Sequence, residues 1–443
     1  MKKILKVIVI LLLLGLAIVI YLNYPRLNII TGYSAKNMDS SVFLAGRSAE
    51  FTDETDNNFS PVSIAEDKVD FDTKSTIASV YGLVKRQAIY RYRLGSVLVI
   101  DESDIDKPYE SPNRVIKKNN LPFPYGELEQ RDTLFGNIDY TSLNKAVDNA
   151  FSDTEKTRAV VVVYKDHIIA EKYGEGFDKN SKILGWSMTK SITATMYGIL
   201  QSQGRLTVND QAPIESWKND ERKNITIGDL LHMNSGLEWN EDYNTISDVT
   251  KMLFLEKDMA KVQENKPMLY QPDTHWNYSS GTSNLLSGML HTYFSSQQEY
   301  LNFWYSALID KIGMYSMIIE ADLSGNYVGS SYAWANARDW AKFGLLYLHR
   351  GDWNGTQIFN ASWVDYVTTP TNTSNGQYGA HFWLNAGGVY PDAPKDLFSC
   401  NGYQGQRVFI IPSRDMVIVR MGLTEEPDFD FNAFLKGVLN SVN

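Results

Sequence analysis

The chain has 443 residues, of which 43% are hydrophobic and 21% charged, and its formal net charge is −10 at pH 7. This is the composition of a globular protein with ample apolar material for a large core. Nucleic acid is excluded as a probable partner, because phosphate binding depends on clustered lysine and arginine, and no basic stripe is present. The single cysteine, Cys400, excludes an intrachain disulfide and a metal site built from cysteine.

The first predicted element is a membrane anchor over residues 1–25. Three lysines within the first six residues precede an uncharged apolar run, Val7–Leu22, which is typical of an export signal. With the two apolar residues before the third lysine, the run approaches the roughly 17 residues that a tilted spanning helix needs. Residues 21–25 are bulky and offer no small-x-small cleavage site. We therefore expect an uncleaved signal anchor, with cytoplasmic lysines and everything after Pro25 extracytoplasmic.

A first region outside the membrane is expected over residues 26–130. Thr76–Val84 and Ala88–Ile100 are rich in Val, Ile and Tyr. The polar triplet 85–87 separates them, which predicts a strand pair. Residues 101–126 carry acidic side chains and four prolines, a composition that indicates an extended arm wrapped on a body rather than a domain.

The remaining residues, 131–443, are predicted to form the main domain. Apolar residues at helical spacing over 143–151 predict an amphipathic helix. Ala159–Tyr164 and His167–Tyr173 predict a hairpin, and its first strand is apolar throughout, which favours a central place in a sheet. A helix is expected from about Ser187 to Gln203.

Short helices and loops alternate over residues 205–370, and strand patterns then return. These later elements are the strands His381–Asn385, Gln406–Ile411 and Met416–Gly422, and the closing helix Phe429–Val442. Strands therefore lie at both ends of the domain and helices in the middle. This order predicts an α+β fold in which one antiparallel sheet, flanked by helices, carries an inserted helical lobe. A cleft between sheet and lobe is the expected place for a site.

Ser187 and Lys190 are the first candidate catalytic residues. Positions i and i+3 share one face of a helix, so the hydroxyl and the amine can meet. Serine is a weak nucleophile until a base removes its proton, and lysine can be that base when burial favours its neutral amine. The same spacing at Ser142 and Lys145 indicates an N-cap serine and a solvated lysine. The Ser187–Lys190 pair differs from this second pair because Trp186 precedes it and apolar residues follow it, so its lysine is expected to be buried.

Two further motifs carry chemistry. Tyr278 lies in the segment Trp276–Gly281, and a phenol beside a Ser–Lys pair can relay a proton to a leaving group. The segment Gly402–Gln406 opens a strand, where glycines permit close approach by a substrate. The Gln406 N–H could then pair with that of Ser187 to form an oxyanion hole.

In this order and at these separations, the three motifs resemble the serine β-lactamase and penicillin-binding superfamily. Within it, the chain is most similar to the class C β-lactamase and esterase group, in the branch of the 6-aminohexanoate-dimer (nylon-oligomer) hydrolases. The resemblance is carried by Gly185–Ser191, Ile225–Gly236, Trp276–Leu286, Pro412–Asp415 and the early stretch from Thr31-Gly32 to Gly46-Arg47. It implies a β-lactamase/transpeptidase-like fold and an acyl-enzyme on Ser187, with Lys190 as base, Tyr278 as proton shuttle, and the Ser187 and Gln406 amides as oxyanion hole.

Two positions depart from the family pattern. Ser280 stands where the second motif often has asparagine, and Tyr403 leads the third motif, where lysine or histidine is common. A lysine there would bind the carboxylate of a penicillin, and tyrosine offers no such charge. The resemblance with these departures predicts a small amide or ester as substrate, without cofactor or metal. The residues expected to contact that substrate are Trp186, Ser280, Tyr403 and Gly405.

Two functional classes stay open. The first is an enzyme that hydrolyses small amides or esters, with a β-lactamase as the alternative enzyme. The second is a penicillin-binding-like sensor or peptidase that acylates without efficient turnover, or an inactive scaffold. The lipase elbow Gly-x-Ser-x-Gly is absent around Ser187, because Thr189 holds the place of the last glycine, and there is no His-Glu-x-x-His zinc motif. The intact Ser–Lys–Tyr set favours the enzyme.

Overall fold

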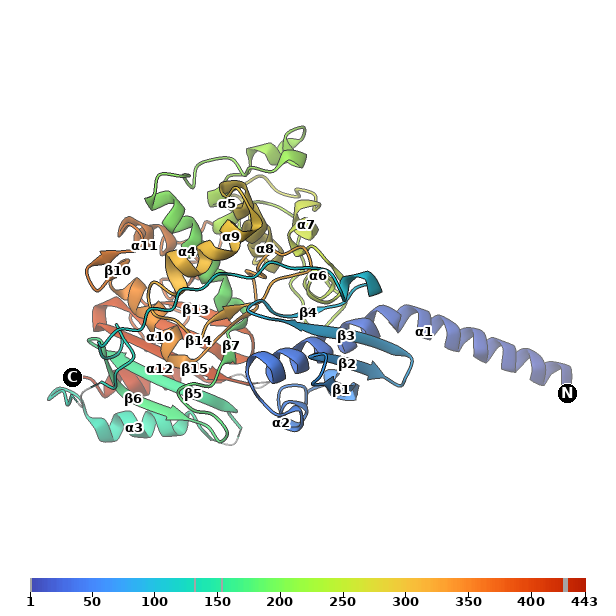
Figure 1. Ribbon diagram of the computed structural model, residues 1–443, viewed down its shortest axis with the longest axis horizontal. Helices are drawn as coiled ribbons and strands as arrows, with labels where there is room; N and C mark the ends of the chain where they lie inside the picture. The colour runs from blue at the N-terminus through green and yellow to red at the C-terminus, as the bar shows by residue number, and fades with distance from the viewer. Residues whose placement is uncertain (1, 131–132, 153, 425–428) are drawn as a thin grey trace. The chain divides into compact units, whose positions relative to one another are not determined.

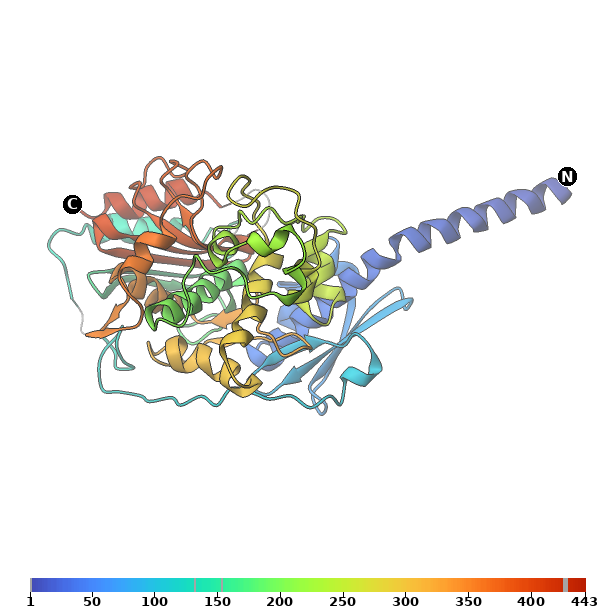
Figure 2. The same cartoon turned by 90° about the horizontal axis from the view of Figure 1, so that it is seen from above.

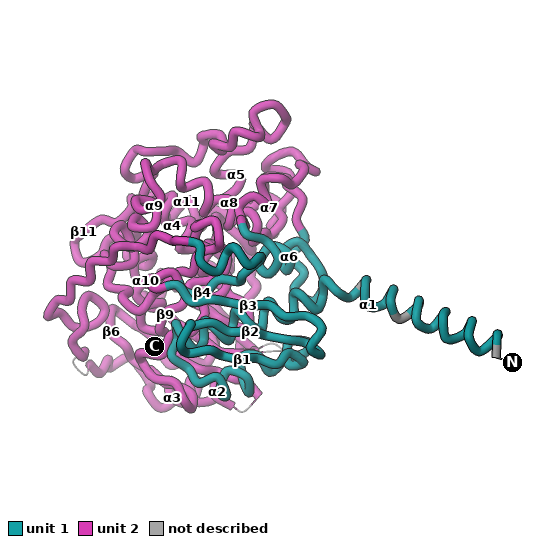
Figure 3. The backbone as a smooth tube through the Cα atoms, turned by 45° about the vertical axis from the view of Figure 1, so that its right-hand side comes forward, with its two compact units in different colours: residues 1–91, 95–107, 240–257 teal, residues 92–94, 108–239, 258–443 magenta. Residues whose placement is uncertain are grey.

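The computed structural model describes residues 2–130, 133–152, 154–424 and 429–443. The chain divides into two compact units, which Figure 3 colours separately. Unit 1 comprises residues 1–91, 95–107 and 240–257, and unit 2 comprises residues 92–94, 108–239 and 258–443. Segment 240–257 thus belongs to unit 1 although it lies far along the sequence from the rest of that unit.

Unit 1 begins with α1, a helix of 38 residues over Lys2–Asp39. Within it, Lys3–Tyr21 is the one segment among the described residues that is long and apolar enough to cross a membrane, and it is not covered by the rest of the protein. Length and composition fit a spanning helix and a signal sequence alike. The helix does not end at Pro25, as a proline often requires. It continues because residues from Ile30 onward are buried in unit 1, and this packing outweighs the lost backbone hydrogen bond.

The rest of unit 1 is built on an antiparallel sheet of four strands in chain order. The strands are β1 (Glu66–Asp70), β2 (Ser75–Val80), β3 (Val84–Arg91) and β4 (Gly95–Leu98). The predicted strand Thr76–Val84 contains most of β2, and the predicted strand Ala88–Ile100 contains the end of β3 and all of β4. The predicted break at residues 85–87 is wrong because these residues lie inside β3. The turn falls at Tyr81–Leu83, where Tyr81 and Gly82 both adopt positive φ. The helices of the unit that follow α1 are α2 (Ala49–Glu54) and α6 (Asp248–Leu255).

Unit 2 contains an antiparallel sheet of six strands in the order β12-β13-β14-β15-β5-β6. These strands are β5 (Thr157–Tyr164), β6 (His167–Tyr173), β12 (Trp383–Leu384), β13 (Phe398–Gly402), β14 (Gln406–Ile411) and β15 (Met416–Gly422). Strands from both ends of the domain therefore share one sheet, as the sequence predicts, and β5 lies in its interior.

Both faces of this sheet are covered, which explains the apolar run in β5. Val161 and Val163 belong to the core on one face, and Val160 and Val162 to the core on the other. Figures 1 and 2 show two helices on the second face. These helices are α3 (Tyr140–Asn149) and α12 (Phe431–Asn440). The first face carries α10 (Ala337–Leu348) and α4 (Thr189–Ser202).

Helices dominate the segment between β6 and β12. They include α5 (Ile227–Leu231), α7 (Met259–Glu264), α8 (Ser280–Met289), α9 (Gln297–Trp304) and α11 (Ser362–Val367). Two small antiparallel sheets lie among them, one of β7 (Ile183–Leu184), β9 (Ala333–Ala335) and β8 (Ile318–Ile319), the other of β10 (Asp352–Trp353) and β11 (Thr356–Gln357). The fold is thus a mixture of antiparallel sheets and helices, which confirms the predicted class at that level.

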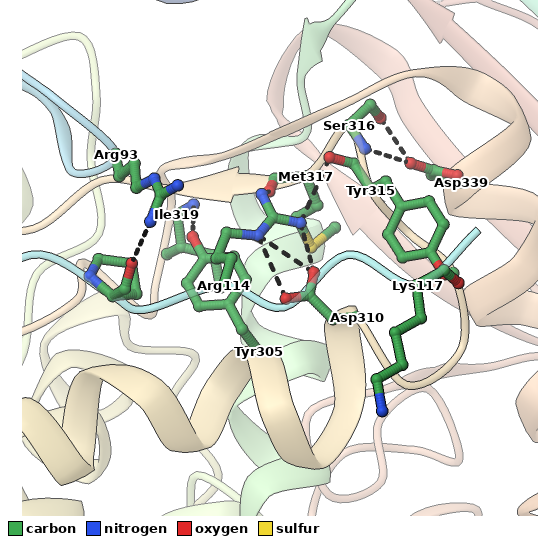
Figure 4. A network of polar contacts seen from close by, with 12 residues as sticks. Arg93, Arg114, Lys117, Tyr305, Asp310, Tyr315, Ser316, Met317, Ile319 and Asp339 are labelled. Carbon is green, nitrogen blue, oxygen red and sulfur yellow. Dashed lines mark hydrogen bonds and ion pairs between the residues drawn. The ribbon is translucent and has the colours of Figure 1, made fainter.

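Residues 108–126 of the predicted arm belong to unit 2, and Arg114 binds this segment to the rest of the unit, as Figure 4 shows. The Arg114 guanidinium donates to the Asp310 carboxylate at 2.6 Å and to the Met317 carbonyl at 2.7 Å, and it lies 4.4 Å from the centre of the Tyr305 ring. Because both charged side chains are almost completely buried, this forked contact is shielded from water. A second bond runs from the Tyr315 hydroxyl to the Lys117 carbonyl at 2.6 Å.

Candidate active site

Ser187 lies in a short 3₁₀ turn, η4 (Trp186–Met188), directly before α4. Trp186 adopts a positive φ of 47°, a left-handed conformation that costs a bulky residue free energy and is found mainly where the surroundings enforce it. Gly185 fits tightly, since a Cβ there would overlap the Trp340 ring. The turn is thus held by its surroundings, and it presents a half-buried Ser187.

Lys190 is 1% exposed, and its Nζ atom lies within hydrogen-bond distance of three oxygen atoms. The Nζ atom lies 2.9 Å from the Ser187 hydroxyl, 2.9 Å from the Ser280 hydroxyl and 2.9 Å from the Ser330 carbonyl. The structure therefore brings together the Ser187 and Lys190 side chains as the helical spacing predicts. Ser280 and Ser330 come from segments far along the sequence and add two oxygen neighbours to the nitrogen.

The second Ser–Lys pair has a different environment. Ser142 and Lys145 are exposed on α3. The Ser142 hydroxyl donates to the carboxylate of Asp139 at 2.6 Å, and Asp139 is the N-cap of the helix. The predicted N-cap role of Ser142 is therefore wrong, because Asp139 is the N-cap. Ser142 is an exposed residue in the first turn of the helix.

Tyr278 lies beside Lys190, in the loop before α8. The Lys190 Nζ atom is 4.9 Å from the centre of the Tyr278 ring. The ring packs against Trp383 at 5.3 Å and Tyr378 at 5.7 Å between centroids. The structure thus places the three predicted catalytic side chains next to one another, from η4, α4 and the α8 loop.

Ser280 follows Tyr278 by two residues and is fully buried at the start of α8. Its hydroxyl accepts a hydrogen bond from the side-chain nitrogen of Lys190. The sequence suggests a substrate contact at this position, whereas the geometry gives Ser280 a contact with the lysine.

The third motif approaches the Ser187 turn through Gly402. A Cβ at Gly402 would overlap the carbonyl oxygen of Gly185, so glycine at this position permits β13 to end beside η4. Gln404 and Gly405 then adopt positive φ values of 59° and 81°, and β14 starts at Gln406. The Gln406 side chain exchanges two bonds with the Gly422 backbone, at 2.6 Å and 3.0 Å, which fixes the first residue of the strand.

Two aromatic residues stand at this turn. The Trp186 indole N–H donates to the Gln404 side chain at 3.3 Å. The Tyr403 ring is exposed and meets the Trp186 ring edge-on, with 5.6 Å between centroids. Trp186 itself is buried. Of the predicted substrate contacts, Tyr403 is thus accessible to solvent, and the buried Trp186 packs against its ring.

The two arginines near the third motif point to the other face of the sheet. Arg407 donates to the Gly402 carbonyl at 3.0 Å and stacks 4.3 Å over the ring of Phe431, a residue of α12. Arg420 donates to the Gly405 carbonyl at 3.0 Å. Burial lowers the pKa of Arg420 to about 9, which leaves it charged at neutral pH. Neither arginine replaces the cation that Tyr403 lacks.

His381 lies behind the site and ties three segments together. The Leu231 carbonyl can only accept, so the His381 Nδ1 atom, 2.7 Å away, carries a proton. The Nε2 atom then accepts from the Ser283 hydroxyl at 2.8 Å. Burial lowers the pKa of His381 to about 3, so the ring is neutral. Its own carbonyl accepts from the Ser191 hydroxyl, one residue after Lys190.

Sequence reasoning missed Ser330 and Arg420. Ser330 contributes a backbone carbonyl, which any residue type has, so no motif could reveal it. Arg420 lies in a strand with apolar neighbours, and its contacts are with the backbone of another turn. The only sequence signal is a charged residue within an otherwise apolar strand, which indicates a buried charge that needs polar partners.

Comparisons with known proteins identify the family of the chain. The sequence matches the family described as Beta-lactamase over residues 149–436. It is 22% identical over 323 residues to the 6-aminohexanoate-dimer hydrolase of Paenarthrobacter ureafaciens, covering 65% of this chain and 78% of that protein.

Solved structures share the fold. A protein of Bacillus anthracis superposes with a TM-score of 0.57 at 20% identity, over 74% of this chain and 89% of its own. A family VIII carboxylesterase superposes with a TM-score of 0.55 at 15% identity, over 68% of this chain and 97% of its own. The family match spans more than half of the sequence, and the chain therefore belongs to the beta-lactamase family of hydrolases.

Proposed function

We propose that the protein is a serine hydrolase that cleaves small amides or esters through an acyl-enzyme on Ser187. The observation that carries the proposal is the 2.9 Å contact between the Ser187 hydroxyl and the amine of a buried lysine, Lys190. A half-buried serine on a strained turn, beside a lysine withdrawn from water, is the arrangement that activates a serine without histidine.

The contacts of Lys190 suit the neutral amine that a general base requires. A neutral amine has two N–H groups and one lone pair. The Ser330 carbonyl and the Ser280 hydroxyl would accept from the two N–H groups. The lone pair would then be directed at the third neighbour, Ser187, and would take its proton as Oγ attacks the substrate carbonyl.

Tyr278 would carry that proton onward. As the C–N or C–O bond of the substrate breaks, the leaving amine or alcohol needs a proton, and the Tyr278 phenol beside the amine is placed to relay it. The backbone N–H groups of Ser187 and Gln406 would stabilise the negative charge on the carbonyl oxygen. Water then attacks the acyl-enzyme, the acid leaves, and Ser187 recovers its proton.

Tyr403 supports amides and esters over penicillins as substrates. Its ring is exposed beside the Ser187 turn, and it presents no positive charge to a carboxylate. Arg407 and Arg420 are bound elsewhere. The relative from Paenarthrobacter ureafaciens is named a 6-aminohexanoate-dimer hydrolase, and a dimer of an amino acid joined by an amide bond belongs to this class. A β-lactamase, or a sensor that acylates without turnover, is the alternative.

A second part of the proposal concerns location. We propose that α1 anchors the protein in a membrane through Lys3–Tyr21, with both units on the extracytoplasmic side. The support is an uncovered apolar stretch of 19 residues preceded by positive charge. Since the same helix continues into the core of unit 1 after Pro25, the anchor and the folded unit would share one rigid element.

The test of activity uses a fragment of residues 26–443 and its Ser187→Ala variant. We expect hydrolysis of nitrophenyl esters and linear amides, and a loss of several orders of magnitude in kcat/KM in the variant. Ser142→Ala is the matched control, because it removes an exposed serine that has the same spacing to a lysine. Full activity in a folded Ser187→Ala protein would remove Ser187 from the mechanism. A stable mass increase with nitrocefin and no turnover of any ester or amide would favour the sensor.

The test of location is membrane fractionation of the full chain with mass spectrometry of its N-terminus. We expect the full chain in the membrane fraction and the 26–443 fragment in the soluble fraction. A mature N-terminus downstream of residue 22 would identify a cleaved signal and a secreted protein.

A further inference from the structure

The turn between β2 and β3 in unit 1 exposes large apolar side chains. Tyr81 is 73% exposed and Leu83 is 68% exposed, on either side of Gly82. Tyr81 and Gly82 both have positive φ values, which favour glycine and asparagine. The backbone of the turn therefore does not explain why apolar side chains stand here. Large apolar side chains exposed together in this way often mark a site that binds a protein or a membrane.

The strands of this sheet run along α1. At one end of the sheet, Phe43, just after α1, meets Phe71 at 5.8 Å and Tyr90 at 6.1 Å between ring centroids. The β2–β3 turn lies at the opposite end of the strands and therefore points towards the N-terminal part of α1. Figures 1 and 2 show its tip level with the uncovered part of that helix.

We propose that the β2–β3 turn inserts Tyr81 and Leu83 into the interfacial layer of the bilayer that α1 spans. The inference rests on the proposed anchor. Tyrosine and leucine suit this layer, because the ring and the aliphatic side chain enter the apolar boundary while the phenol stays among the headgroups. A helix and a second point of contact together would fix the depth and tilt of unit 1 on the membrane.

The contact is apolar rather than ionic. Lys85 follows the turn and is exposed, but the exposed Glu66 begins β1 at the same end of the sheet. Since the two charges offset each other, attraction to anionic lipid is not the driving force. A zwitterionic bilayer is therefore the matching partner, and added anionic lipid should change the contact little.

The experiment places a fluorophore on the turn of the full-length protein in phosphatidylcholine vesicles. Leu83→Cys is labelled with an environment-sensitive dye, and lipids with a nitroxide near the top of the acyl chain serve as quenchers. Phe71→Cys is the matched control, because Phe71 is 67% exposed on the turn at the opposite end of the same sheet. The native Cys400 is 1% exposed and does not compete for the label.

We expect quenching at position 83 several-fold stronger than at position 71, and unchanged when a fifth of the lipid is replaced by phosphatidylserine. Equal, weak quenching at both positions in a protein that floats with the vesicles would overturn the inserted turn while leaving the anchor in place. Failure of the protein to float with the vesicles would overturn the anchor and the inserted turn together.

Discussion

Arg420 donates to the Gly405 carbonyl at 3.0 Å. Its side chain lies on the face of the sheet that carries α12, and this bond holds the turn beside Ser187 from that face. The Arg420 side chain is fully buried, and its Nη2 atom donates to the Glu155 carbonyl at 2.7 Å and to the Thr157 hydroxyl at 2.8 Å. A Cβ at Gly405 would overlap this guanidinium. The arginine thus joins the start of β5 to the turn that leads into Gln406.

We expect Arg420→Lys to lower kcat by about ten- to a hundred-fold with a smaller change in KM. A lysine ammonium cannot bond both to Glu155 and Thr157 and to the Gly405 carbonyl, so the Gln406 N–H would lose its fixed direction. In the proposed mechanism this N–H is an oxyanion donor, and such a donor acts mainly in the transition state. Steady-state kinetics with a nitrophenyl ester measure the split. Arg114→Lys is the control: it disturbs another buried guanidinium, whose bonds run to Asp310 and Met317, so it should lower the melting temperature and leave kcat unchanged. Equal kcat in both variants would limit Arg420 to a structural role.

Lys190→Arg should be nearly as inactive as Lys190→Ala. Arginine keeps the positive charge but does not give up its proton at working pH, so it cannot act as a base. The measurement is kcat/KM of the two variants against the same ester. A substantial rate in the arginine variant would show that the residue acts through its charge alone.

Tyr403→Lys should raise activity on penicillins relative to esters. A charge-assisted hydrogen bond to the penicillin carboxylate contributes about 1.5–3 kcal/mol, or roughly ten- to a hundred-fold in binding. The ratio of kcat/KM for a penicillin and a nitrophenyl ester, measured on one preparation of each protein, reports the change. If the wild type already prefers the penicillin, the protein should be regarded as a β-lactamase.

Stability should fall as the pH is lowered, in part because of His381. Its pKa is about 3 in the folded protein and about 6.5 in an unfolded chain. Between these values the unfolded chain binds the proton and the folded protein does not, so the free energy of unfolding decreases as pH falls through this window. From pH 7 to pH 5 the loss from this residue is about 2 kcal/mol.

His381→Gln removes this titration and keeps an amide in its place. Denaturant unfolding at the two pH values should therefore show a smaller loss in the variant than in the wild type. Other groups that titrate in this range, such as His349, contribute to both proteins and cancel in the comparison. An identical pH dependence of the two proteins would show that His381 is not held neutral by burial.

The amino-acid sequence determined the elements whose pattern is local. The uninterrupted apolar residues of β5 predict a central strand, and the structure places β5 in the interior of the sheet with both faces covered. The i, i+3 spacing of Ser187 and Lys190 places their side chains together, because a 3₁₀ turn that leads directly into a helix keeps positions three apart on one side. The order of the three motifs likewise indicates the family.

Tertiary packing decided what depends on contacts between distant segments. The two further oxygen neighbours of Lys190 come from Ser280 and Ser330, and one of them is a backbone carbonyl that no sequence pattern reports. Gly402 is needed because Gly185 lies against it, and Arg420 supports Gly405 from another strand. Helix α1 passes through Pro25 because its later residues are buried against unit 1. Periodicity and spacing record short-range geometry, whereas these contacts exist only once separate segments are packed in one core.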